Sequence, residues 1–120
     1  MMSWDGIDRR RFVRVKVSFK AHIYDEERTI ISTYAEELSQ KGIKVSIKKE
    51  LKRKTLVDLE IYVRDEPIIC RGKIVWVKKI EGSYLESGFI FDIGIELQEL
   101  KEEDKKYIKS FILQKRKESS

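Results

Sequence analysis

Apolar and polar residues alternate one by one along most of this chain, which is the period of a strand with one buried face. The alternation is strictest in residues 13–24, where the apolar face would comprise Val13, Val15, Val17, Phe19, Ala21 and Ile23. Five further segments have the same period or a β-branched and aromatic composition: residues 29–38, 43–48, 57–63, 68–79 and 89–97. The pattern therefore predicts six strands joined by short polar turns.

One face of the fifth segment is expected to carry Cys70, Gly72, Ile74 and Trp76. We expect Gly72 to mark a bulge or a close approach of two backbones. Core or barrel-covering positions are predicted for the large side chains Trp76, Phe89 and Phe91. Cys70 is expected to be a small buried apolar residue.

The period changes in residues 101–117, where Tyr107, Ile108, Phe111 and Ile112 recur at helical spacing. Acidic residues occupy the first turn of this segment and basic residues the last, which suits the helix dipole. Because no helix is predicted between the strands, the sheet should be antiparallel, and six strands with one solvated face close most easily into a small barrel. We therefore predict a mainly β fold, a six-stranded antiparallel barrel over residues 13–97 with a C-terminal helix that caps an open side.

The composition limits the class of protein. The chain has 120 residues, 41% apolar and 39% charged, which suits a single globular domain. No apolar run approaches the roughly 20 residues that span a bilayer, and no secretory signal begins the chain, so we expect a cytoplasmic protein without membrane insertion. The chain has one cysteine, Cys70, and one histidine, His22, too few for a disulfide, a metal cluster or a nucleophile with its base. We expect neither an enzyme nor a cofactor.

The net charge of +5 is unevenly distributed. Residues 1–20 contain six basic and two acidic side chains, residues 41–54 contain seven basic and one acidic, and residues 25–37 are acidic. Such blocks favour a local anion site over a uniformly basic nucleic-acid coat.

Two polar clusters are candidates for that site. The first comprises the arginines Arg9, Arg10, Arg11 and Arg14, whose planar forks can grip a phosphate or the O6/N7 edge of guanine. The second is the turn of residues 37–42, Glu-Leu-Ser-Gln-Lys-Gly, which meets the first only if the chain folds back. Alone, the first cluster would be interpreted as a solvated basic tail and the second as a common turn between strands. The presence of both clusters in one chain indicates a binding site.

These motifs together resemble the PilZ domain, a bacterial receptor module for the second messenger cyclic di-GMP. The family's signatures are RxxxR before the first strand and (D/N)xSxxG after the second. Arg10 and Arg14 fit the first, Ser39 and Gly42 fit the second, and Glu37 stands where Asp or Asn is usual. Residues 72–76 and 93–97 also resemble the family's fifth and sixth strands, so that the resemblance covers nearly the whole chain.

The resemblance implies a cyclic di-GMP site composed of Arg9, Arg10, Arg14, Glu37, Ser39 and Gly42. In such a site the arginines would supply forked donors, the residue at 37 would accept from the N1/N2 edge of guanine, and Ser39 would offer a hydroxyl. Gly42 would allow a close backbone approach or a positive φ. The resemblance further implies that residues 1–12 form a flexible arginine-rich segment, which orders over the ligand and signals to an effector protein.

Glu37 is the one departure from the family pattern. Its carboxylate is one methylene farther from the backbone than that of Asp, so it could accept from guanine after a small shift, crowd the site, or pair with Arg10 or Arg14. Weakened binding is favoured over lost binding.

Two other functions stay open from the sequence. One is a degenerate PilZ adaptor that acts through protein contacts without a nucleotide. The other is a small basic barrel that binds single-stranded RNA or DNA, which would place aromatic residues among basic ones on a strand face. The polar face of the first predicted strand instead offers mainly Arg14, Lys16, Lys20 and His22, so no nucleic-acid partner is expected.

Overall fold

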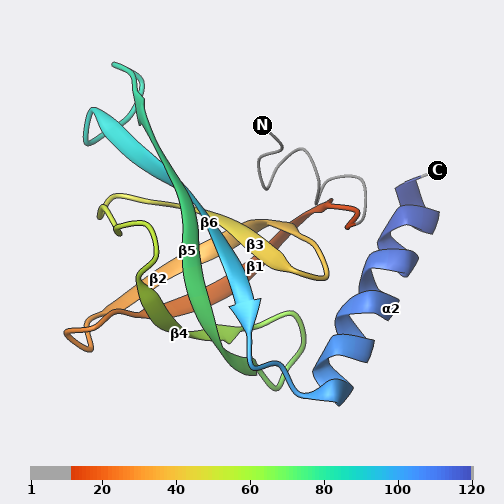
Figure 1. Cartoon of the computed structure of the whole chain (residues 1–120). Coiled ribbons are helices and arrows are strands. Elements are labelled where there is room, and N and C mark those ends of the chain that lie inside the picture. Colours follow the sequence, from red (N-terminus) through yellow and green to blue (C-terminus); the bar gives the residue numbers. More distant parts are fainter. Residues whose placement is uncertain (1–11, 120) are drawn as a thin grey trace, which may run out of the picture.

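The structure is a computed structural model that describes residues 12–119 and contains, within them, six strands and one helix (Figure 1). The strands are β1 (Val15–Tyr24), β2 (Ile30–Leu38), β3 (Gly42–Ile47), β4 (Leu56–Ile61), β5 (Ile68–Glu81) and β6 (Phe89–Gln98), and the helix is α2 (Glu102–Ser119). Neighbouring strands pair antiparallel and close a barrel in the order β1-β2-β3-β6-β5-β4. The predicted six-stranded antiparallel barrel with a C-terminal helix is confirmed.

The element boundaries differ slightly from those predicted. Val13 precedes β1, and Val63 lies in the bend after β4 instead of inside that strand. The reason is pairing: Ile61 and Ala21 form the terminal matched pair of β4 and β1, and the Tyr62 amide still donates to the Lys20 carbonyl at 2.9 Å, so Val63 lies beyond the pairing with β1.

The barrel interior holds the apolar face that the alternation predicts. Ile23, Leu59, Ile74 and Ile93 are among the side chains that are fully enclosed, and Cys70 and Phe91 are buried as expected. α2 adds Ile108 and Ile112 to this core, and the ring of Phe111 meets that of Phe19 edge-on at 6.2 Å. The predicted packing face of the helix is therefore confirmed.

A partly buried ion pair also holds α2 in place. Asp104, in the first turn of the helix, is 5% exposed, and its Oδ1 accepts a hydrogen bond from the Arg64 guanidinium at 2.7 Å. The same guanidinium lies 4.6 Å from the centre of the Tyr107 ring. Because a buried carboxylate without a partner is strongly destabilising, this pair fixes the helix against the β4–β5 connection.

A β-bulge in β5 changes the expected faces of that strand. Ile74 pairs with Ile95 and Trp76 with Gly94, so Val75 is an extra residue on β5. One extra residue reverses the side-chain alternation, and the expectation that Trp76 shares the face of Ile74 is wrong.

Gly72 is neither the bulge nor a close approach of two backbones, because the atoms crowded over it belong to side chains. A Cβ at this position would lie 2.5 Å from Cγ2 of Ile95 and 2.8 Å from Cδ1 of Leu59. The two opposing side chains fill the space over Gly72, so glycine is required there by packing.

The bulge also begins a long hairpin arm. β4 pairs with β5 only as far as Lys73, whereas β5 and β6 continue to pair up to Glu81 and Phe89. The outer part of this hairpin reaches past the barrel at the end away from α2 (Figure 1).

The β1–β2 connection is held by a buried carboxylate. Asp25 Oδ1 accepts hydrogen bonds from the backbone amides of Glu27 and Thr29, and Oδ2 accepts one from the Lys49 ammonium group in the β3–β4 connection. The Lys49 bond, followed by the Thr29 amide, lowers the pKa of Asp25 below its ordinary value of 3.8. Asp25 therefore links two connections that are distant in the sequence.

This lowered pKa predicts a pH-dependent contribution to stability. A carboxyl group with a lower pKa in the folded than in the unfolded state stabilises the protein at pH values above its unfolded pKa, and this stabilisation is lost as the pH falls through the folded pKa. We expect the free energy of unfolding, measured with urea, to fall between about pH 5 and about pH 3, and Asp25→Asn to reduce that slope. Asp65→Asn, at an exposed turn position, should keep the wild-type slope; an equal reduction in both variants would contradict the assignment.

Candidate functional site

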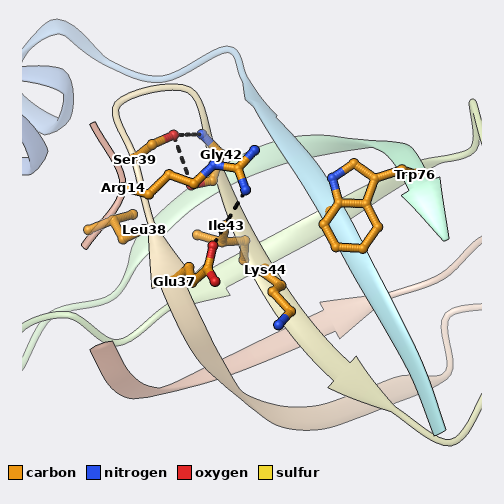
Figure 2. A pocket seen from close by; sticks show the side chains of 9 residues that line it. Arg14, Glu37, Leu38, Ser39, Gly42, Ile43, Lys44 and Trp76 are labelled. Carbon is orange, nitrogen blue, oxygen red and sulfur yellow. Dashed lines mark hydrogen bonds and ion pairs between the residues drawn. The ribbon is translucent and has the colours of Figure 1, made fainter. Parts of the chain in front are cut away.

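Four of the predicted site residues line one small pocket. Arg14, Glu37, Ser39 and Gly42 come together with residues of β3, β5 and β6 (Figure 2). The complete lining is Arg14, Glu37, Leu38, Ser39, Gly42, Ile43, Lys44, Trp76 and Gly94. Its volume is about 20 Å³, room for about one water molecule, so a larger ligand would lie across its mouth.

The turn of residues 38–42 is shaped by Ser39. Its Oγ is buried and accepts hydrogen bonds from the backbone amides of Lys41 at 3.1 Å and Gly42 at 3.0 Å, and its own amide donates to the Gly42 carbonyl at 2.9 Å. In this structure the hydroxyl therefore organises the turn and is already engaged. The Ser-x-x-Gly spacing favours this turn because a serine hydroxyl can accept hydrogen bonds from the amides two and three residues ahead.

Gly42 allows two strands to approach closely, and its backbone does not adopt a positive φ. A Cβ there would lie 2.6 Å from the carbonyl oxygen of Ile95 on β6, whereas Gly88 is the one glycine of residues 12–119 with a positive φ. The absence of a side chain lets β3 and β6 draw together beside the pocket. Of the two roles predicted for Gly42, the structure selects the first.

Arg14 and Glu37 form an ion pair on the pocket wall. The chain enters β1 at Val15, which is paired with Leu38 on β2, so Arg14 lies beside the end of β2. Its Nη1 is 3.5 Å from Glu37 Oε1, and the two side chains are 24% and 29% exposed. Pairing with Arg14 is one of the outcomes considered for Glu37, and a half-exposed pair of this kind contributes only about 0–1 kcal/mol.

Lys44 adds a second cation to the pocket. Its Nζ lies 3.5 Å from Asp92 and 3.5 Å from Glu36. Partial burial lowers the pKa of Lys44, but the neighbouring carboxylates of Asp92 and Glu36 outweigh it and hold the pKa above its ordinary value. Lys44 is therefore a permanently charged group at the edge of the site.

Trp76 is the pocket residue that the sequence analysis placed elsewhere. The bulge at Val75 turns its indole outward onto Gly94, where a Cβ would lie 2.1 Å from Nε1. That Nε1 is buried, and among residues 12–119 it has no hydrogen-bond partner. Figure 2 shows the indole across the pocket from Glu37 and Ser39. An unpaired buried N–H donor is unfavourable, and it marks a place where an acceptor atom would be stabilised.

The remaining predicted site residues, Arg9 and Arg10, lie outside the described residues, as do Arg11 and most of the segment of residues 1–12. The role of Trp76 was missed because a bulge has no reliable sequence signal. The nearest signal was the glycine at 94, which the sheet places opposite the indole.

Two chemical features are absent from the described part of the chain. Residues 12–119 contain no group of three or more His, Cys, Asp or Glu side chains that could hold a metal ion. α2 is also not apolar enough to cross a membrane.

Burial raises the pKa of the Cys70 thiol to about 12, so this cysteine stays protonated and unreactive at neutral pH.

Comparison with known proteins identifies the family. The sequence profile of the PilZ domain matches residues 8–114, which includes every strand and most of α2. The chain belongs to the PilZ domain family. PilZ domains are non-enzymatic receptor domains for cyclic di-GMP. No curated protein sequence matches this PilZ domain.

Solved structures share the fold. The inhibitor of motility MotI from Bacillus subtilis superposes with a TM-score of 0.74 at 19% identity, covering 95% of this chain and 54% of MotI. The PilZ domain of YcgR from Escherichia coli, solved with c-di-GMP, gives 0.73 at 10% identity, covering 92% and 94% of the two chains. The K. pneumonia MrkH–c-di-GMP complex gives 0.74 at 17% identity, covering 92% of this chain and 54% of MrkH. This PilZ domain thus spans about half the length of MotI and of MrkH.

The contact between Trp76 and Gly94 can be tested by fluorescence. We expect Gly94→Ala to push the indole toward solvent, because the added Cβ overlaps Nε1, and so to shift the emission of Trp76 to longer wavelengths. The measurement uses a Trp4→Phe background, so that Trp76 is the only tryptophan.

The control for this experiment is Ser83→Ala, a small change at an exposed position between β5 and β6 that lines no part of the pocket. It should leave the emission unchanged. An unshifted spectrum in a folded Gly94→Ala variant would show that the indole does not rest on Gly94.

Proposed function

We propose that this PilZ domain is a cyclic di-GMP receptor that binds its ligand across the pocket of Arg14, Glu37 and Trp76. The observation that carries the proposal is that two separate motifs line the same pocket. One motif lies before β1 and the other lies at the end of β2 and in the β2–β3 turn, and the sequence predicted that they form one site. Family membership and the shared fold of two c-di-GMP-bound proteins support the choice of ligand.

The chemistry of the pocket suits this ligand. Cyclic di-GMP combines two phosphates with two guanines, so it requires cations, forked donors and an acceptor for the guanine N1/N2 edge. Arg14 and Lys44 provide the positive charge, and Glu37 provides an acceptor. The ring of Trp76 supplies a surface for base stacking. Its unpaired Nε1–H is buried against Gly94 and would become a donor for the ligand only if the indole moved.

The small size of the pocket supports a role for the arginine segment. A pocket of about 20 Å³ admits only a small part of a dinucleotide, so a bound ligand would present most of its surface outward. Residues 1–12 carry Arg9 and Arg10 and lead directly to Arg14. We propose that this segment folds over the ligand and that an effector protein reads the ordered segment.

One observation favours the second candidate, a degenerate adaptor that binds no nucleotide. The Arg14 guanidinium lies 3.5 Å from Glu37, so a ligand must compete with an internal carboxylate. The energy of such a partly exposed pair is small, about 0–1 kcal/mol, compared with about 1–3 kcal/mol for one bidentate guanine contact. Competition of this size weakens binding without abolishing it, which favours the receptor.

The receptor is tested by isothermal titration calorimetry with cyclic di-GMP, with GTP as the control nucleotide. We expect saturable binding to cyclic di-GMP that GTP does not reproduce. Arg14→Ala should lose roughly 1–3 kcal/mol of binding free energy, the size of one bidentate contact, with unchanged thermal unfolding.

Two results would contradict the proposal in different ways. An unchanged dissociation constant in Arg14→Ala would remove Arg14 from the site. The absence of any heat or thermal shift in the wild-type protein at high ligand concentration would establish the degenerate adaptor instead.

Glu37→Asp tests the internal competition. The shorter side chain withdraws its carboxylate from Arg14 while keeping an acceptor for guanine, so we expect binding of cyclic di-GMP to tighten about two- to fivefold, equal to an ion pair of up to about 1 kcal/mol. The dissociation constant is measured by the same titration. Weaker binding in this variant would show that the pocket is adapted to glutamate.

A further inference from the structure

A second concave surface lies at the barrel end away from the candidate site. It is a groove between the β3–β4 connection and the β5–β6 arm, with a volume of about 480 Å³. Its lining is Glu50, Leu51, Lys52, Arg53, Val77, Lys79 and Phe91. We call this surface the arm groove. None of the predicted cyclic di-GMP contacts belongs to it.

The floor of the arm groove is apolar. Leu51 is 5% exposed and Phe91 7% exposed, and Val77 packs partly buried against the same core. Val77 points into the groove because the bulge at Val75 reverses the alternation of β5. A floor of this kind accepts an apolar side chain from a partner.

The walls of the arm groove are basic. Lys52 and Arg53 are exposed, and neither forms an ion pair with a carboxylate of the described chain. Among residues 12–119 the one ion-pair partner of Lys79 is the exposed Glu81, at 3.5 Å, and Glu50 is the one acidic residue of the lining. Neighbouring cations without partners repel each other, and carboxylates of a partner would relieve that repulsion.

The basic wall is preformed. The amide of Lys54, which has a φ of 74°, donates to the Ile74 carbonyl at 2.7 Å, and the Ile74 amide donates to the Thr55 carbonyl at 2.9 Å. The same connection is held at its other end by the Lys49 to Asp25 bond. A partner therefore meets an ordered loop, which reduces the entropic cost of binding.

We infer that the arm groove docks an acidic segment of a protein partner, with one apolar side chain on the floor and carboxylates against Lys52 and Arg53. A single-stranded nucleic acid fits less well, because stacking needs exposed rings. Phe91 is 7% exposed, and the Lys79 ammonium lies 4.9 Å from the centre of the Phe89 ring. The inference locates a partner surface for the proposed receptor and rests on that proposed function for its role in signalling.

The test is a selection from a displayed library of random peptides with the full-length protein as bait. We expect the enriched peptides to carry carboxylates on both sides of one apolar or aromatic residue. Binding of one enriched peptide, measured by fluorescence anisotropy, should weaken about tenfold or more in Lys52→Glu with Arg53→Glu, because attraction becomes repulsion.

The matched control is Lys106→Glu with Lys109→Glu, which changes the net charge equally at exposed positions of α2. It should bind the peptide like the wild-type protein. Equal weakening in both variants, enrichment of peptides without carboxylates, or tighter binding of oligothymidine than of the peptides would overturn the inference.

Titration of the Lys52 and Arg53 variant with cyclic di-GMP separates the two proposals. Unchanged ligand binding together with lost peptide binding supports the arm groove as a distinct surface. Loss of both in a folded variant would overturn this separation. If the wild-type protein does not bind cyclic di-GMP, the receptor proposal fails, and the arm groove is still tested by comparing peptide binding in the two charge-reversed variants.

Discussion

Closure of the barrel is the constraint on which the rest of this structure depends. Because β1 pairs with both β2 and β4, the sheet has no free edge at this point, and each strand must direct alternate side chains to a single shared interior. The bulge at Val75 interrupts this alternation in β5 and moves the two following residues to new surroundings. Trp76 turns onto the outer wall and enters the candidate ligand site, whereas Val77 turns inward and lines the arm groove. Adjacent residues of β5 thus belong to two different surfaces.

The candidate site depends on two close approaches of backbone. The Ser39 hydroxyl ties the turn before β3, and Gly42 lets β3 run against the Ile95 carbonyl. Antiparallel pairing with β1 then brings Arg14 beside the same turn. Glu37, Ser39 and Gly42 are held by the turn and the sheet, so a ligand bound there would find these residues in place. The arginine segment before Phe12 would supply the part that must order on binding.

Electrostatics in this protein is local. The cations around the pocket are balanced by Glu37, Asp92 and Glu36. In the arm groove Lys79 pairs with Glu81, whereas Lys52 and Arg53 form no ion pair with a carboxylate of residues 12–119. The net charge of +5 is therefore unevenly distributed between two surfaces. The cations of the candidate pocket are neutralised by nearby carboxylates, whereas Lys52 and Arg53 of the arm groove are not. The pocket suits a ligand that displaces Glu37 from Arg14, and the arm groove suits an acidic partner, because Lys52 and Arg53 are not engaged by carboxylates of residues 12–119. The distinction follows from which side chains the fold brings together, since neither surface is continuous in the sequence.

The sequence alone determined the class of fold, the six strands and the helix, because period-two and period-3.6 patterns report directly on which face is buried. It also predicted four residues that line the pocket, Arg14, Glu37, Ser39 and Gly42, since the two motifs have spacings that a folded turn and a strand entry bring together. The tertiary structure decided the roles within that site: Ser39 is engaged in the turn, Gly42 serves close approach, and Glu37 pairs with Arg14. It also decided the position of Trp76, since a bulge arises from the register between β5 and β6 and not from local residue preference. For the same reason the arm groove has no signature in the sequence, because its floor and walls come from three segments that meet only when the barrel closes.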